Sequence, residues 1–172
     1  MNVPVVAFEV AGERYGIGAV GVVEVVPAVP LRAVPGTVPG VAGLLRFRGG
    51  LVPVVDLGVV WAGRPSPVRL SSRIVVCELS DAGGSWADVA SRARPRVGLL
   101  AERVLRVASV DPDAAEAGEG PKTPGARGLG RIVRDGEALL QLVRVDDLVP
   151  ADVLASLVRD AGATVAEPGA TP

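Results

Sequence analysis

The two halves of the chain repeat one pattern of residues in the same order. Residues 14–26 align without a gap to residues 96–108, with matching arginine, glycine, alanine and two valines. A second echo links 43–57 to 128–148: each begins Gly-Leu-x-Arg, passes through a turn into an apolar run, and closes on Asp-Leu. The sequence therefore predicts two homologous all-β units of about 60 to 70 residues each, with a groove between them.

Composition narrows the classes of function. With 172 residues, 49% of them hydrophobic, the chain can bury a substantial core. A net charge of -1 and 3% aromatic residues give little to neutralise phosphates or stack on bases, so nucleic acid is not expected as a partner. Histidine is absent and Cys77 is the single cysteine, which removes the commonest general base, most zinc ligand sets and any intramolecular disulfide.

The same features predict a cytoplasmic location without direct membrane insertion. A lone cysteine fits a reducing compartment. The apolar run at the N-terminus follows no positively charged region, so no signal peptide is expected. The longest uncharged stretch, 33–45, is interrupted by prolines and glycines, which argues against a membrane-spanning helix.

Short apolar runs separated by turn residues predict that most elements are strands. Residues 5–10 and 14–17 flank a turn and predict a hairpin. Four prolines within 27–39 predict an extended connection, because each removes a backbone donor and disfavours helix at the residue before it. The runs 51–57 and 73–79 read as apolar strands, and in the second of these Cys77 is expected to be a small buried hydrophobe.

We expect one domain over residues 1–150, with barrel units at about 5–65 and 73–148 and possible exchange of strands between them. After this domain, a short helix is predicted over 151–162, because four apolar residues share one helical face: Val153, Leu154, Leu157 and Val158. The tail 163–172 is expected to be disordered.

An insertion at 80–95, rich in glycine, serine and alanine, predicts a mobile loop. Its Trp86 has two interpretations: a ring that folds back over the barrel surface, which we favour, or an anchor for a partner.

Motifs that resemble catalytic or nucleotide sites do not have the required context. Residues 16–21 match G-x-G-x-x-G, but β-branched residues follow where a dinucleotide site needs a helix. Lys122 lies in a glycine-rich loop without phosphate-loop spacing. Four aspartates are better explained as structural residues at turns and strand ends: Asp111, Asp113, Asp146 and Asp147. We therefore predict no catalytic residue, no cofactor and no metal site.

Glu24 and Arg48 are charges embedded in apolar β sequence. Their counterparts in the second half are Arg106 and either Val133 or Arg134, so the repeat predicts that the second unit does not reproduce this charged pair. Two interpretations stay open. Both side chains could point to solvent on alternate strand faces, or they could form a pair that positions a partner at an otherwise apolar surface.

Residues 34–57 resemble the CheW-type chemotaxis coupling proteins. The likeness lies in a proline-bounded loop, a glycine, the Arg48-Gly49 turn and the strand Pro53-Val-Val-Asp-Leu57, with weaker similarity over 8–26 and 96–148. The resemblance implies an all-β fold of two SH3-like five-stranded barrels side by side, with a short C-terminal helix. It also implies a non-enzymatic adaptor, whose partners are the cytoplasmic tip of a chemoreceptor and the regulatory domain of a CheA-like histidine kinase.

By that resemblance, the receptor binds in the groove between the barrels. Contact is implied for Val22, Gly43, Arg48 and Gly49, with Glu24 supporting Arg48 across the first barrel. The kinase is implied to bind an exposed apolar end of the first barrel. One residue departs from the family pattern, because Arg46 stands where asparagine is usual, and this bears on receptor preference.

Two alternatives remain for the function. The first is a stand-alone β-barrel sensor of a small molecule, and the second is a CheW-like scaffold in a two-component pathway other than chemotaxis. An enclosed apolar cavity with convergent polar groups favours a sensor, whereas a filled core with an open, shallow groove favours an adaptor.

Overall fold

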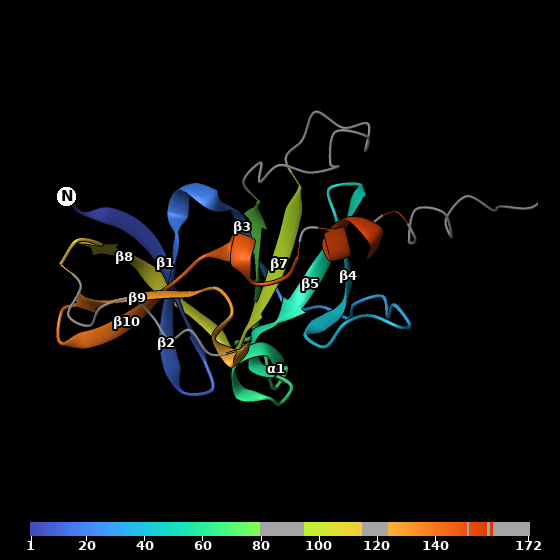
Figure 1. Ribbon diagram of the computed structural model, residues 1–172, viewed down its shortest axis with the longest axis horizontal. Helices are drawn as coiled ribbons and strands as arrows, with labels where there is room; N and C mark the ends of the chain where they lie inside the picture. Colours follow the sequence, from blue (N-terminus) through green and yellow to red (C-terminus); the bar gives the residue numbers. More distant parts are fainter. Residues whose placement is uncertain (80–94, 115–123, 151, 158, 160–172) are drawn as a thin grey trace, which may run out of the picture.

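The structure is a computed structural model that describes residues 1–79, 95–114, 124–150, 152–157 and 159. Two five-stranded sheets lie side by side (Figure 1). Sheet A contains β1 (Val3–Val10), β2 (Glu13–Gly18), β8 (Arg103–Val110), β9 (Leu129–Asp135) and β10 (Ala138–Val143). Sheet B contains β3 (Val22–Pro27), β4 (Val41–Phe47), β5 (Gly50–Asp56), β6 (Arg73–Glu78) and β7 (Arg96–Ala101).

Helical structure is short. One α-helix, α1 (Leu57–Ala62), follows β5, and residues 152–157 are helical near the C-terminus. Three 3-10 turns complete the described elements: η1 (Ala19–Gly21), η3 (Pro124–Ala126) and η4 (Val145–Asp147). No helix in the described part of the chain is long and apolar enough to cross a membrane. The predicted architecture, mostly β with two five-stranded units and a short C-terminal helix, is confirmed.

The duplication appears in the strand order. Sheet A runs β8-β1-β2-β10-β9 and sheet B runs β3-β6-β7-β5-β4, which is the same order when each strand is replaced by its repeat counterpart. The repeated segments 14–26 and 96–108 are where the chain changes sheet, from β2 to β3 and from β7 to β8. Each sheet thus takes strands from both 5–65 and 73–148, and the sheets do not divide the chain into these two consecutive ranges.

The glycines of the repeat are explained by packing between strands. Strand β2 pairs in parallel with β10, and β7 pairs in parallel with β5. A Cβ atom on Gly16 would lie 2.5 Å from Cδ2 of Leu140, and one on the equivalent Gly98 would lie 3.0 Å from Cγ2 of Val54. Strand β2 continues through η1 into another strand, so residues 16–21 do not form a nucleotide-binding turn before a helix.

Strands β1, β5, β6 and β7 read as continuous apolar runs because both of their faces are buried. The main apolar cluster fills the seam between the sheets, with Phe8 from sheet A and Val55, Val75 and Cys77 from sheet B. Alternate residues of the same strands face a second cluster within sheet B, and sheet A has its own third cluster. Burial raises the pKa of the Cys77 thiol to about 12, as expected for a structural cysteine.

Helix α1 was not predicted. Its apolar residues continue the pattern of β5, so sequence reasoning extended that strand to Leu57 and predicted no helix after it. The start and stop signals are nevertheless present: Asp56 caps the first turn by accepting from the N–H of Gly58, and Gly63 ends the helix with a left-handed backbone at φ 67°.

Several predictions near the chain end and in loops can be placed only in part. Leu154 and Leu157 are buried, as the helical face predicted. Asp111 opens a turn by accepting from the N–H of Asp113, and this bond is the main cause that lowers the pKa of Asp111. The predictions for Trp86, Lys122, Val158 and the tail 163–172 lie outside the described residues.

Candidate functional site

Glu24 and Arg48 form an ion pair at one end of sheet B. Nη2 of Arg48 donates to Oε2 of Glu24 at 2.8 Å, and the side chains are 58% and 43% exposed, respectively. The sequence left two interpretations open, a pair or two solvent-exposed charges. The structure combines them, because the two charges form a pair and both side chains are exposed to solvent. An exposed pair of this kind contributes at most about 1 kcal/mol to folding, so stability alone gives little reason for it.

The turn that carries Arg48 has an unusual backbone for an arginine. Phe47 pairs with Gly50, which leaves Arg48 and Gly49 as a two-residue hairpin loop with φ of 47° and 78°. Two positive φ values are typical of a type I′ turn, where asparagine or glycine is preferred at the first position. The Arg48 guanidinium is held over the Phe47 ring, with Cζ 4.9 Å from its centroid, as well as by Glu24.

The ion pair joins the two ends of a curled sheet. Glu24 lies on β3 and Arg48 follows β4, and these are the two outermost strands of sheet B. The connection after β3 then runs beside β4, where the N–H and C=O of Arg32 both pair with Leu44 at 2.9 Å. The ion pair therefore joins the β3 and β4 sides of sheet B, which also meet through the hydrogen bonds between Arg32 and Leu44.

The prediction that the second unit lacks such a pair was wrong. Arg106 on β8 forms an ion pair with Asp135 at the end of β9, and these strands are the outermost strands of sheet A. Arg106 is the repeat counterpart of Glu24, so the pair is reproduced with its charges exchanged. The error came from the register of the second hairpin, which places the acid one residue after Arg134.

The structure separates the five residues assigned by resemblance into two groups. Glu24, Arg48 and Gly49 lie together, and Val22 begins the same strand as Glu24 and packs partly buried against the seam. Gly43 is buried in the middle of β4, where a Cβ atom would lie 2.7 Å from the carbonyl oxygen of Arg32. Its absent side chain therefore serves the packing of sheet B.

A hollow of about 350 Å³ lies at the rim of the seam, near the start of β3. The apolar clusters fill the seam itself, so the groove between the sheets is shallow. The hollow is lined by residues of both sheets and of the segment after β10: Ile17, Gly18, Gly21, Glu78, Val143, Arg144, Val145, Asp146 and Asp147.

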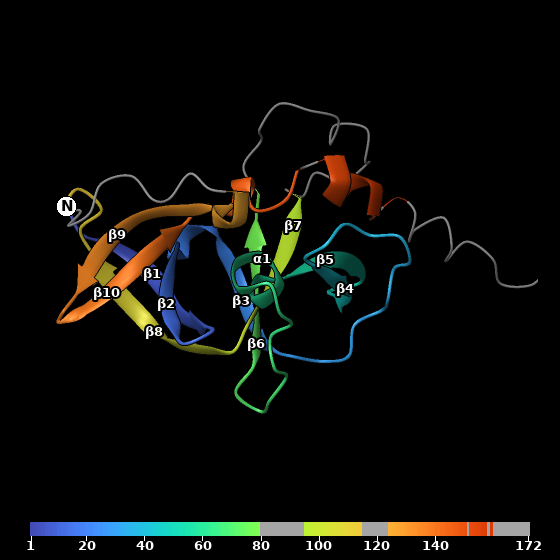
Figure 2. The same cartoon turned by 60° about the horizontal axis from the view of Figure 1, so that its bottom comes forward.

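The opposite end of sheet B exposes apolar side chains. Val29, Val68 and Leu70 are 46%, 69% and 99% exposed, and we call these three residues the apolar end. Ala28 donates its N–H to the carbonyl of Ser72, which brings the two segments together. The loop before β6 projects at the lower edge of the molecule in Figure 2. Glu24 pairs with Val76, three residues after the start of β6, so this end lies ~10 Å or more from the ion pair at ~3.4 Å per residue.

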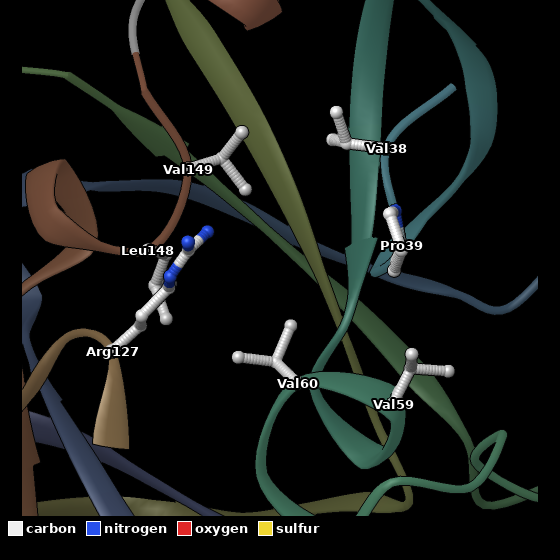
Figure 3. A pocket seen from close by; sticks show the side chains of 7 residues that line it. All are labelled: Val38, Pro39, Val59, Val60, Arg127, Leu148 and Val149. Atoms are coloured by element: carbon white, nitrogen blue, oxygen red, sulfur yellow. The ribbon is translucent and has the colours of Figure 1, made fainter. Parts of the chain in front are cut away.

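A second cavity, of about 370 Å³, lies beside α1 (Figure 3). Its lining is apolar except for Arg127, whose guanidinium lies beside Leu148. Trp61 connects α1 to the segment that carries Arg127, because its Nε1–H donates to the carbonyl of Arg127 at 2.9 Å. The remaining lining residues are Val38, Pro39, Val59 and Val149.

Four charged residues line the hollow at the seam, namely Glu78, Arg144, Asp146 and Asp147, and one lines the cavity beside α1, namely Arg127. Within the described ranges, no three acidic or cysteine side chains gather at a spacing suited to a metal ion. Asp147 pairs with Arg144 at 2.9 Å on the surface, which is a structural arrangement.

Comparison with known proteins places this geometry in a family. The chemotaxis protein CheW of Treponema pallidum (strain Nichols) is 24% identical over 153 residues, covering 88% of this chain and 85% of that protein. The crystal structure of the scaffolding protein TtCheW from Thermoanaerobacter tengcongensis superposes with a TM-score of 0.70 at 22% identity, covering 89% of this chain and 91% of that one. The CheW-like domain model matches residues 4–153, and the chain therefore belongs to the CheW-like domain family.

Proposed function

We propose that this chain is a cytoplasmic, non-enzymatic adaptor that couples chemoreceptors to a CheA-like histidine kinase. The observation that carries the proposal is the presence of two unlike surfaces at opposite ends of sheet B. One surface is the exposed Glu24–Arg48 pair next to the Phe47 ring, and the other is the apolar end. Membership of the CheW-like family supports the assignment of partners.

The receptor is assigned to the surface with the ion pair, with Val22, Glu24, Arg48 and Gly49 as contacts. A charged pair held beside an apolar ring provides direction and selectivity for a helical partner. Arg48 keeps a backbone conformation that costs free energy in an arginine, and the pair is too exposed to offset this through stability. Arg46 is exposed on β4, two residues before Arg48, and adds a positive charge where the family usually has asparagine.

We expect Arg48→Glu and Glu24→Arg each to weaken receptor binding about tenfold while changing unfolding free energy by less than about 1 kcal/mol. The double variant restores an ion pair with exchanged positions, so we expect normal stability and weak binding. Calorimetric titration with a soluble cytoplasmic receptor fragment measures the affinity, and urea denaturation measures stability. Arg106→Glu is the matched control, because it breaks the mirrored pair of sheet A.

Failure of the unaltered chain to bind both a receptor fragment and a kinase regulatory domain at high micromolar concentration would discard the adaptor function. Equal weakening by Arg106→Glu would mean that the ion pairs act only on the fold.

The kinase is assigned to the apolar end. Leu70 is held outward by a braced loop: Ser72 accepts from the N–H of Arg69 and donates to the carbonyl of Pro67, and Arg73 donates to the carbonyl of Leu70. Because the backbone of this loop is already fixed, it loses little conformational entropy when a partner binds over Leu70.

We expect Leu70→Asp to weaken binding of a kinase regulatory domain at least tenfold, since a charge would be desolvated in an apolar contact. Receptor binding should not change, because the other end of sheet B carries it. Leu139→Asp on sheet A, also an exposed leucine, is the control. Kinase binding that survives Leu70→Asp would remove this surface from the proposal.

The sensor alternative has less support. The seam is filled by side chains, and the cavity beside α1 has only one charged group, Arg127, to orient a ligand. A CheW-like scaffold in another two-component pathway would use the same two surfaces with a different receptor.

A further inference from the structure

Arg96 lies beside the ion pair although it is distant in the sequence. It begins β7, and its Cζ lies 5.7 Å from the centroid of the same Phe47 ring that holds Arg48. Phe47 is buried at the end of the apolar cluster within sheet B. Two guanidinium groups are therefore positioned by one aromatic ring, as cation–π contacts allow.

The two arginines differ in their partners. Arg48 is neutralised by Glu24. Among the described residues Arg96 has no ion pair, and its Nε is buried without a hydrogen-bond partner. Glu78 is its register partner on β6 but forms no ion pair with it. Arg96 thus adds to exposed Arg46 a positive charge that no ion pair among the described residues neutralises.

That charge sets a condition on any partner that covers Phe47 and Arg48. Contact removes water from Arg96, and a desolvated guanidinium without a counter-charge is strongly unfavourable. A carboxylate placed on the guanidinium converts this cost into a charge-assisted hydrogen bond. Charge complementarity therefore favours an acidic side chain at the matching position of the partner.

We propose that Arg96 is a second receptor-contacting cation beside Arg48, and that it receives an acidic side chain of the receptor tip. The proposal rests on the receptor assignment above and extends the contact surface across Phe47 to β7. The site then contains two cations that differ in pairing. Arg48 is already paired with Glu24, whereas Arg96 gains a counter-charge only when the receptor binds.

The test uses the full chain and a soluble cytoplasmic fragment of a methyl-accepting chemotaxis receptor from the same organism, titrated at low and high salt. Arg96→Met keeps an aliphatic stem over Phe47 but removes the charge. We expect it to weaken binding at least about tenfold and Arg96→Glu to weaken it further. Arg96→Met should also reduce the salt dependence of the affinity. Arg14, exposed on sheet A, is the control in the same two substitutions.

Unfolding midpoints of all variants must match that of the unaltered chain for the comparison to count, and Arg96→Met is the variant expected to preserve it best. If the unaltered chain binds and Arg48→Glu weakens binding, yet Arg96→Met binds normally, the inference about Arg96 is wrong and the adaptor function stands. If the unaltered chain does not bind the fragment, the receptor assignment and this inference both fail.

Discussion

Gly43→Ala should lower the free energy of unfolding by about 3 kcal/mol. Two costs combine at this position. The backbone has φ of 147°, a conformation that residues with a side chain rarely adopt. The new Cβ atom would also lie 2.7 Å from the carbonyl oxygen of Arg32 and 3.0 Å from Cβ of Leu31.

Gly18→Ala is the matched control. Gly18 ends β2, its φ is -54°, and no atom lies within 4 Å of a Cβ placed there. Urea denaturation of both variants should show a lower midpoint with an unchanged slope for Gly43→Ala alone. In heating experiments, its midpoint should fall by roughly 6–12 °C. A Gly43→Ala protein as stable as Gly18→Ala would mean that the segment at Arg32 moves away freely.

This result matters for interpreting binding. Resemblance places Gly43 among the receptor contacts, but a variant that weakens binding at Gly43 would do so by separating β4 from the connection that carries Leu31 and Arg32. Arg48 and Glu24 are the better probes of contact, because they are exposed and their removal leaves the fold intact. Comparing stability and binding for each variant separates these two causes.

The fold was largely predictable from the repeat, whereas the assignment of strands to sheets was not. Equivalent strands such as β3 and β8 have similar patterns, so either could complete either sheet. The sequence was consistent with strands staying in their own half or exchanging. The short connection through η1 carries the chain from one sheet to the other, and such geometry is not encoded in apolar periodicity.

The candidate site was predictable only where charge interrupted an apolar pattern. Glu24 and Arg48 were visible for that reason, and their ion pair is present. Arg96 was not singled out, because its contact with Phe47 joins strands that are not neighbours in sheet B. Asp135 was missed because a one-residue difference between the two hairpins moves the acid out of the aligned position.

The two ion pairs occupy equivalent places in the two sheets but differ in detail. Each sheet brings its outermost strands together at a charged pair, which indicates an arrangement inherited from the duplicated unit. In sheet B the arginine lies in the turn, with a left-handed backbone and beside the Phe47 ring. In sheet A the arginine lies on β8 and the acid lies at the end of β9.

Asp56→Ala is expected to have an effect of similar size, about 3 kcal/mol of lost unfolding free energy. The carboxylate is buried and accepts from the N–H of Gly58 at 2.9 Å, the N–H of Ser66 at 3.0 Å and the hydroxyl of Ser66 at 2.6 Å. Alanine removes the cap of α1 and leaves the Ser66 N–H buried without an acceptor. Because Trp61 of α1 stacks on Tyr15 of sheet A at 4.3 Å, the contact between the sheets should loosen as well.

The repeat supplies the control for this prediction. Asp147 is the counterpart of Asp56, but it lies exposed in a surface pair with Arg144, so Asp147→Ala should cost less than about 1 kcal/mol. Urea denaturation measures both variants, and hydrogen exchange at the amides of Gly58 and Ser66 reports on the cap directly. Unchanged protection of those amides in Asp56→Ala would show that Ser66 alone holds α1. Faster exchange at both, with Asp147→Ala unaffected, would show that one copy of the repeated aspartate anchors α1 while the other is only a surface charge.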